Sequence, residues 1–327
     1  MNSKLKSMSN AEINYLEIIK KAAGITWRNR YLWWFGFFIL ISSTSGSFFQ
    51  YSPREKVVDK EKLFAFTTAH REWIIFAVLA ALAVWVALLA LGIIGKGALI
   101  KSINSLVEKK ESNFKSGWKD GRKYFWKIFF IGILASIFVL ATLVVFVIPI
   151  GFLFYNEAYL LGGLLSFLAL VIFIPVVFLA SFIRIYGYFY AILSGLAVGE
   201  ALENAYALLK KNIVPSIIIS LVFLAIATIA TLAAFLLIIP VLIIFFVIGT
   251  LLFFLAKQIG IIITVILGSL FILAVLIFGG SVYQVFTHAI LVLFFREIAT
   301  PKIPEEVETE KVVELGPAHA IDPVAGS

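Results

Sequence analysis

Long apolar runs without charged residues are the feature that most limits how this chain can fold. Asp, Glu, Lys, Arg and His are all missing from residues 31–50, 74–95, 128–156, 164–183, 212–256 and 259–287. About 20 apolar residues in an α-helix cross the hydrocarbon core of a bilayer, where lipid offers no partner to free backbone groups. Apolar residues make up 62% of the chain, against roughly 45–50% in soluble domains. We therefore predict an all-α, polytopic membrane protein.

These runs predict six transmembrane helices. Their approximate bounds are 31–50, 73–95, 125–149, 164–189, 213–239 and 261–288. The fifth apolar stretch, Ile213 to Ala256, has 44 residues, and one helix of that length would extend about 66 Å, beyond a hydrocarbon core of about 30 Å. We expect Pro240 to end this span near Ile239, because proline removes a backbone donor and clashes with the preceding turn. An apolar segment would then lie at the outer surface, and Pro149 would end the third span in the same way.

Basic residues determine the predicted orientation. Twenty of the 27 lysines and arginines lie on one side of the six spans and six on the other, and short cytoplasmic loops are enriched in these residues. We therefore predict a multi-pass protein of the plasma (inner) membrane with both termini in the cytoplasm. The tail, residues 300–327, is acidic and poor in aromatic residues, which is typical of disorder. The net charge of +8 predicts anionic lipid headgroups as partners, and not nucleic acid.

An internal repeat divides the predicted membrane domain, residues 1–299, into three units. The segment GITWRNRYLW, from Gly24, matches GWKDGRKYFW, from Gly117, at an offset of 93. Near the end of each unit a second motif recurs as GALI (97–100), YAIL (190–193) and HAIL (288–291). The predicted units are about 9–100, 101–193 and 194–299.

Each unit begins with a short amphipathic segment that carries apolar residues at helical spacing, and continues as a hairpin of two spans. The short helices either lie in the headgroup plane or pack against one another as a cytoplasmic cap. They also offer a surface for a protein partner.

The stretch WRNRYLWWFGFF, Trp27 to Phe38, combines two arginines with seven aromatic residues. Tyr and Trp rings favour the headgroup level of a bilayer, and arginines beside them reach the phosphates. We interpret the stretch as a membrane border and not as a ligand site, because similar residues recur at the start of the other units. The predicted interfacial anchors are Trp27, Arg28, Arg30, Tyr31, Trp33, Trp118, Lys123, Tyr124 and Trp126.

Arg184 is the charged residue that lies closest to the interior of a predicted span. About twenty residues into the fourth span, it falls at the inner edge of the hydrocarbon core, where its side chain can snorkel into the headgroups. Alternatively, it pairs with an anionic lipid, or with Glu200 or Glu203. Gln284 and His288 fall at the same level and, four residues apart, share one helix face. We predict a polar ring at the cytoplasmic mouth that contacts lipid or substrate, formed by Lys96, Arg184, Gln284 and His288.

Patterns of catalytic and metal-binding residues are missing from the sequence. The chain has no cysteine, so thiolate chemistry, disulfides and Cys-based metal sites are excluded. His70, His288 and His319 fall in an outer loop, at the end of the sixth span and in the tail, so we do not expect them to converge on one ion. The sequence contains neither a phosphate-binding glycine loop nor a nucleophile elbow. We predict no catalytic residue, cofactor or metal, and hence a protein that is not an enzyme.

The border stretch, the GALI segment and FKSGWKDGRKYFWKIF (114–129) together resemble a broad family of bacterial six-span membrane proteins. Over about residues 10–298 the chain is similar to the membrane domain found N-terminal to some glycerophosphodiester phosphodiesterases, and to stand-alone relatives of unassigned function. The resemblance implies a helical module of the plasma membrane connected with lipid or envelope homeostasis. We expect no phosphodiesterase activity, because no such domain follows in this sequence.

Two functional hypotheses follow. The first is a non-enzymatic membrane module that organises lipid or a protein partner. The lack of charge at mid-membrane favours it, because proton relays and most ion-coupled carriers need such charges. The second is a carrier of an apolar or amphiphilic substrate, which would not need them. A water-accessible cavity between the three units would favour the carrier, and a tightly packed interior would favour the module.

Overall fold

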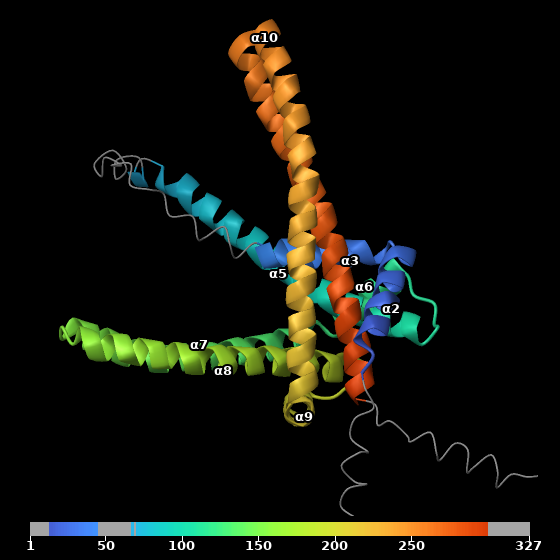
Figure 1. Ribbon diagram of the computed structural model, residues 1–327, viewed down its shortest axis with the longest axis vertical. Helices are drawn as coiled ribbons and strands as arrows, with labels where there is room; N and C mark the ends of the chain where they lie inside the picture. The colour runs from blue at the N-terminus through green and yellow to red at the C-terminus, as the bar shows by residue number, and fades with distance from the viewer. Residues whose placement is uncertain (1–12, 45–66, 69, 300–327) are drawn as a thin grey trace, which may run out of the picture.

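The protein is built from α-helices, as predicted. The computed structural model describes residues 13–44, 67–68 and 70–299; the tail and the end of the first predicted span lie outside them. The elements in chain order are α2 Tyr15–Arg28, α3 Leu32–Thr44, α5 Arg71–Val107, α6 Phe114–Lys123, α7 Phe125–Tyr155, α8 Tyr159–Leu193, α9 Val198–Lys211 and α10 Ile213–Ala299 (Figure 1). In this described part, α5, α7, α8 and α10 are long and apolar enough to cross a membrane, and α3 is a shorter apolar helix.

The longest element, α10, is a hairpin of two antiparallel helices (Figure 1). They are joined at Lys257, whose positive φ of 51° interrupts the helical backbone. Near this tip the two halves approach closely at glycines. A side chain at Gly260 would collide with the backbone carbonyl of Leu252, and one at Gly268 would lie 3.1 Å from the ring of Phe245. The returning half thus stays paired with the first half up to the tip.

The predicted helix break at Pro240 is wrong. The first half of α10 remains helical through Pro240, and α7 likewise continues past Pro149 to Tyr155. A proline removes only one backbone hydrogen bond. Beyond Pro240 the returning half of the hairpin packs against the first half, as at Gly268 and Phe245. Membrane helices tolerate proline for this reason. The apolar segment after Pro240 therefore extends the hairpin and does not form a separate surface element.

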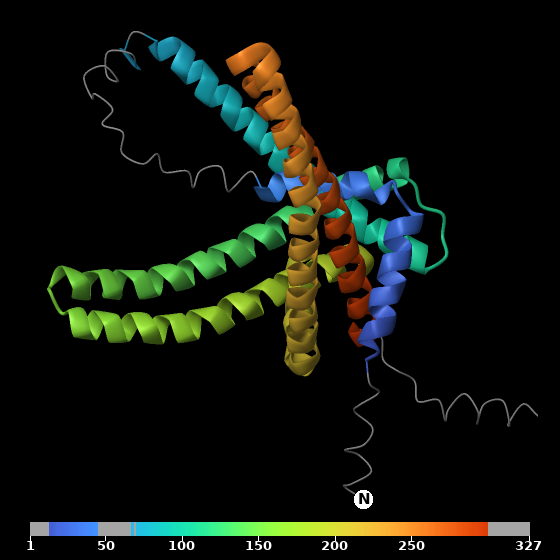
Figure 2. The same ribbon diagram turned by 45° about the horizontal axis from the view of Figure 1, so that its top comes forward.

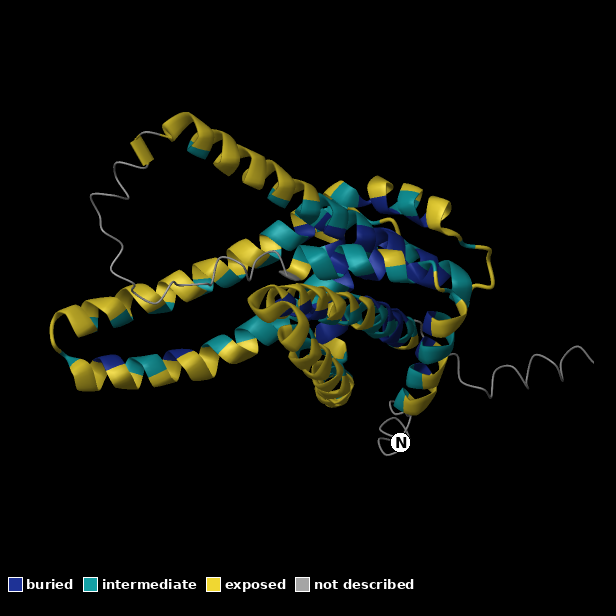
Figure 3. Cartoon of the chain, turned by 90° about the horizontal axis from the view of Figure 1, so that it is seen from above, coloured by how far each residue is buried: buried dark blue, intermediate teal, exposed yellow. Residues whose placement is uncertain are grey.

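Three apolar arms extend from a common base. They are the α7–α8 hairpin, the distal part of α10 and the N-terminal half of α5, and they point in different directions (Figures 1 and 2). Exposed residues cover the arms along their length, while buried residues gather at the base (Figure 3). Large apolar side chains lie on the exposed surface, and Leu160 near the tip of the α7–α8 hairpin is 84% exposed. Soluble proteins rarely expose apolar surface of this extent, so the arms are suited to lipid.

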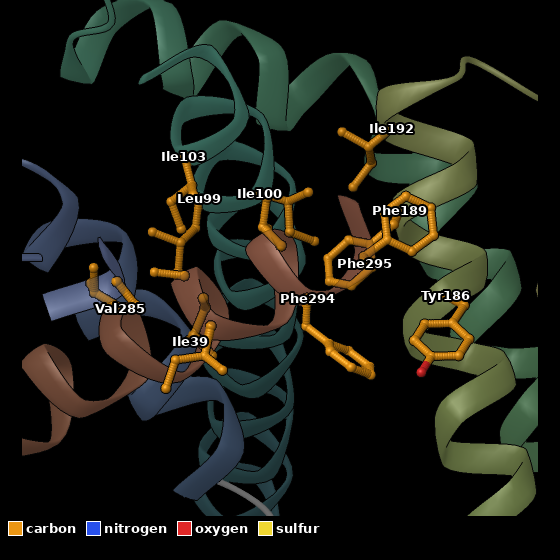
Figure 4. Close-up of a cluster of buried hydrophobic side chains, with 14 of the residues drawn as sticks. Ile39, Leu99, Ile100, Ile103, Tyr186, Phe189, Ile192, Val285, Phe294 and Phe295 are labelled. Atoms are coloured by element: carbon orange, nitrogen blue, oxygen red, sulfur yellow. The ribbon is translucent and has the colours of Figure 1, made fainter. Parts of the chain in front are cut away.

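Aliphatic side chains and aromatic rings fill the base, where the long helices meet (Figure 4). Tyr186 and Phe189 of α8 lie against Phe295 of α10, with ring centroids 6.1 and 5.0 Å apart. The hydroxyl groups of Tyr186 and Ser216 share a hydrogen bond of 2.7 Å, so the polar atom of this fully buried ring is satisfied. The base is thus a packed interior.

Small residues occur at corresponding places where the returning helices enter the base. Ala98 of α5, Ala191 of α8 and Ala289 of α10 are each 0% exposed. They are the alanines of the GALI, YAIL and HAIL segments. The residue that follows each alanine is also buried, namely Leu99, Ile192 and Ile290. Small side chains let helix backbones approach one another, which is how membrane helices commonly pack.

Each short amphipathic helix packs against a long helix of another hairpin. α6 lies on α5, α9 on α8 and α2 on α10. The buried faces of the short helices carry small residues, namely Gly117 and Gly121 in α6, Ala201 and Ala205 in α9, and Ala22 and Thr26 in α2. The short helices thus find their main partners in long helices and not in one another. α6 and α9 each pack on the long helix that precedes them, whereas α2 packs on the last helix, α10. Together these contacts connect the helices in a closed circle.

A polar contact joins the C-terminal ends of α5 and α10. Arg296 Nη1 donates a hydrogen bond to Asn104 Oδ1 at 2.7 Å and lies 3.3 Å from Glu108 Oε1. Lys110 Nζ pairs with the other carboxylate oxygen of Glu108 at 2.7 Å. Hydrogen bonds from Lys110 and Asn104 lower the pKa of the Glu108 carboxyl to about 2. This carboxylate is therefore charged at neutral pH and holds Arg296 in place.

Gly36 allows α3 to lie against α10. A Cβ atom at this position would collide with the backbone carbonyl of Ser281 and lie 3.0 Å from Val285 Cγ2. We predict that Gly36→Ala lowers the free energy of unfolding by about 1–3 kcal/mol, as overpacking of a filled core does. The matched control is Gly24→Ala, because a Cβ there meets nothing within 4 Å; it should leave stability unchanged or raise it by up to about 1 kcal/mol. Equal thermal unfolding midpoints of the two variants in detergent would contradict this packing.

Candidate functional site

Three of the four residues of the predicted polar ring come from three different long helices at the base. Lys96 lies on α5, Arg184 on α8 and His288 on α10, and each side chain is half-buried. The charge of Arg184 acts on Lys96, and the charge of Lys96 acts on His288. Lys96 thus lies within electrostatic range of Arg184 and of His288. We call these three residues the cationic cluster.

The fourth residue, Gln284, contributes to the site through its backbone. Its carbonyl oxygen lies 2.9 Å from Nδ1 of His288 and 3.1 Å from the hydroxyl of Thr287. With a proton on Nδ1, His288 donates to this carbonyl and keeps Nε2 as an acceptor, or as a second donor when the ring is charged. Gln284 therefore orients the imidazole from one helical turn away.

Lys96 and Arg184 have no anionic partner in the described part of the chain. No ion pair or hydrogen bond joins either side chain to another described residue. The alternative partners Glu200 and Glu203 do not pair with Arg184, and the Glu200 carboxylate instead accepts a hydrogen bond of 3.3 Å from the N–H of Ala197. Neighbouring cations repel each other more strongly where water is partly excluded. The cluster is therefore poised to accept an anion.

Tyr188 is a residue of the site that the sequence interpretation missed. It follows Arg184 by one turn of α8 and lies within electrostatic range of it. Its hydroxyl reaches toward α7, where it lies 3.0 Å from the place that a Cβ at Gly132 would take. The i, i+4 spacing from Arg184 is the signal that could have found it. In the sequence, however, Tyr188 resembles any other aromatic residue of a membrane border.

The predicted interfacial anchors separate into two groups. The exposed group consists of Trp27, Arg28, Arg30, Lys123 and Trp126. The partly or fully buried group consists of Tyr31, Trp33, Trp118 and Tyr124. Arg30 and Lys123, which correspond in the repeat, each lie over a neighbouring ring, at 6.0 Å from that of Trp33 and 5.5 Å from that of Tyr124. The exposed group is suited to the headgroup level, whereas the buried group stabilises the base.

Trp33 connects α3 to the end of α2. Its Nε1–H donates a hydrogen bond of 3.0 Å to the backbone carbonyl of Thr26. Its ring meets the rings of Trp27 and Phe278 edge to face, with centroids 5.8 and 5.2 Å away. The border stretch thus has a packing role that its composition alone did not indicate.

The chemistry open to this site is anion binding. In residues 13–44, 67–68 and 70–299, no three His, Cys, Asp or Glu side chains are grouped to hold a metal ion. His70 precedes α5 at the distal end of that arm, far along the helix from the cluster, and His319 lies outside the described residues. Guanidinium and ammonium groups bind phosphate or carboxylate oxygens through charge-assisted hydrogen bonds. The cationic cluster supplies both groups.

Comparison with known proteins identifies no relative. No protein-family model, curated protein or solved structure matches this chain. The geometry of the arms, the base and the cationic cluster is therefore the basis of the functional proposal.

We predict that Trp33→Phe lowers the free energy of unfolding by about 1–2 kcal/mol, because it removes a hydrogen bond and leaves the Thr26 carbonyl without this donor. Trp126→Phe is the matched control, since Trp126 aligns with Trp33 at the offset of 93 and is 62% exposed. It should change stability by less than about 0.5 kcal/mol. Thermal unfolding in detergent tests both variants, and a larger loss for Trp126→Phe would refute the assigned roles.

Proposed function

We propose that this protein is a non-enzymatic module of the plasma membrane whose cationic cluster binds the anionic headgroup of a membrane lipid. One observation carries the proposal: Lys96 and Arg184 are neighbouring, half-buried cations without an anionic partner among the residues described. A lipid phosphate would supply the missing counter-charge and several acceptor oxygens. Binding of this kind would organise lipid around the base.

The proposed architecture has six transmembrane helices in three repeated units. The order of elements supports it, because each short helix is followed by two apolar helical segments, of which only α3 in the described residues is too short to be a candidate span. Burial supports it as well. The residues five positions after the aligned cations Arg30, Lys123 and Lys211 are Phe35, Ile128 and Ser216, and all three are buried. Corresponding positions of the three units thus play the same part in the base.

The proposed orientation places the base and both termini at the cytoplasmic side. The base carries α6 and α9, whose last turns contain Arg122, Lys123, Lys210 and Lys211. Cytoplasmic borders of membrane proteins are enriched in such residues, and anionic lipids of that leaflet attract them. The cationic cluster would then lie at the inner headgroup level.

The filled junction of the hairpins favours a lipid-organising module over a carrier, whereas a cavity of about 920 Å³ between α2 and α10 is the feature that a carrier would use. A carrier needs a path between its moving units, whereas the junction of the hairpins is filled by Tyr186, Phe189 and Phe294, each at most 1% exposed. The resemblance to membrane domains of glycerophosphodiester phosphodiesterases also supports a role in lipid or envelope homeostasis. The exposed faces of the short helices remain available to a protein partner.

Removal of the cluster cations tests the proposed lipid binding. We predict that Arg184→Gln and Lys96→Gln each weaken retention of phosphatidylglycerol by about tenfold, since a hydrogen bond to a charged group contributes about 1.5–3 kcal/mol. Lys119→Gln removes an exposed cation of α6 and should have little effect. Native mass spectrometry of lipid titrations, with phosphatidylcholine as the neutral comparison, measures the change. Equal retention in all variants would refute the proposal.

The absence of cysteine from the chain makes the proposed topology directly testable. We predict that single cysteines at Arg54, Asn156 and Lys257, one for each hairpin, react with a membrane-impermeant maleimide on intact cells. Cysteines at Lys115 and Lys210 should react only after the membrane is opened. Labelling of Arg54 only in opened cells would show that α3 does not cross, and labelling of Lys115 from outside would reverse the orientation.

A further inference from the structure

A slot between α7 and α8 ends at Arg184. It is a cavity of about 370 Å³ with one wall from each helix. Its lining includes Ala135, Val139 and Leu143 of α7, and Val177, Ala180 and Arg184 of α8. The α7 residues follow one another at intervals of four, so they form one face of the helix. Among the described residues that line the slot, Arg184 alone is charged.

The two helices touch at both ends of the slot and leave room between them. Toward the base, a Cβ at Gly187 would lie 3.4 Å from the side chain of Ile131. At the tip, a Cβ at Gly162 would lie 3.2 Å from the ring of Phe154. The slot lies between these contacts, along the part of the hairpin whose outer surface is exposed (Figure 3). It therefore opens on the surface that lipid would cover.

The slot is polar at one end only. Arg184 lies at the end nearer the base, and the Lys96 charge is within range of it. The hydroxyl of Ser181 donates to the carbonyl of Val177 at 2.7 Å and is not free to bind a ligand head. From Arg184 outward the walls are formed by aliphatic and aromatic side chains such as Val139 and Leu143. This distribution matches an amphiphile with a negative head and a hydrocarbon chain.

We propose that the slot holds one hydrocarbon chain of an anionic phospholipid whose phosphate is bound by Arg184 and Lys96. The inference rests on the proposed function. It adds a binding site for a hydrocarbon chain of the lipid to the binding site for the headgroup. A free phosphate would pair with the cations but would leave the apolar slot without an apolar ligand. A neutral lipid would fill the slot but leave the cations unpaired. An anionic phospholipid satisfies both, and the bilayer supplies it.

Filling the slot tests the inference without touching the cations. Ala135→Phe places a ring in the slot, whereas Ala141→Phe places the same ring on the exposed side of α7. We expect Ala135→Phe to weaken retention of phosphatidylglycerol by about tenfold, and Ala141→Phe to leave it unchanged within about twofold. Native mass spectrometry of lipid titrations measures both. Val139→Phe serves in place of Ala135→Phe if thermal unfolding shows that the latter is not folded.

The outcomes separate the slot from the head site. Loss of binding in Arg184→Gln but not in Ala135→Phe or Val139→Phe would refute the hydrocarbon-chain site. The proposed headgroup site would still stand. Loss in none of these variants would overturn both. Competition by water-soluble glycerol phosphate gives an independent measurement. If it displaces phosphatidylglycerol at an equal concentration, the chain contributes nothing and the slot proposal fails.

Discussion

Packing of α3, α5, α8 and α10 into one core at the base is the contact on which the rest of the structure depends. Lipid surrounds apolar side chains as well as protein does, so the hydrophobic effect does not hold membrane helices together. The arms accordingly diverge, and dispersion contacts and hydrogen bonds at the base connect the hairpins. The buried Ala98 faces Gly121 of α6, and the buried Ala191 lies with Ala201 of α9. These alanines lie within two turns of Lys96 and Arg184, so the packing of the short helices on the long ones lies beside the cationic cluster.

The cationic cluster opposes this packing in the absence of an anion. Repulsion between Lys96 and Arg184 acts across the contact of two hairpins, in surroundings that screen charge less than water does. An anion bound between them would remove the repulsion and, because it binds the folded protein, would stabilise the fold. Arg184 also borders the slot between α7 and α8. It is therefore the residue that would connect the proposed headgroup binding and the proposed site for the hydrocarbon chain with the packing of the hairpins.

Sequence reasoning was most successful where a local pattern determines the outcome. Apolar length predicted the helical class, whereas the polar ring, placed at one level by the alignment of the GALI, YAIL and HAIL segments, remains a prediction. Contacts between distant segments were not predictable. The helix continues through Pro240, and the returning half of α10 lies beside it. A rule based on neighbouring residues does not take such a contact into account. The pairing of Arg184 with Glu200 or Glu203 was an alternative by proximity along the chain, but α9 uses Glu200 at its own start.

Because the helix contacts form a closed circle, the order of synthesis decides when each contact can form. α6 and α9 pack on long helices that precede them, so their partners are already present when they leave the ribosome. α2 packs on the returning half of α10, which is synthesised last. The first helix must therefore wait for nearly the whole chain before its buried face is covered, and contacts so distant in sequence form slowly. Until then its apolar side is open to the membrane surface or to a chaperone.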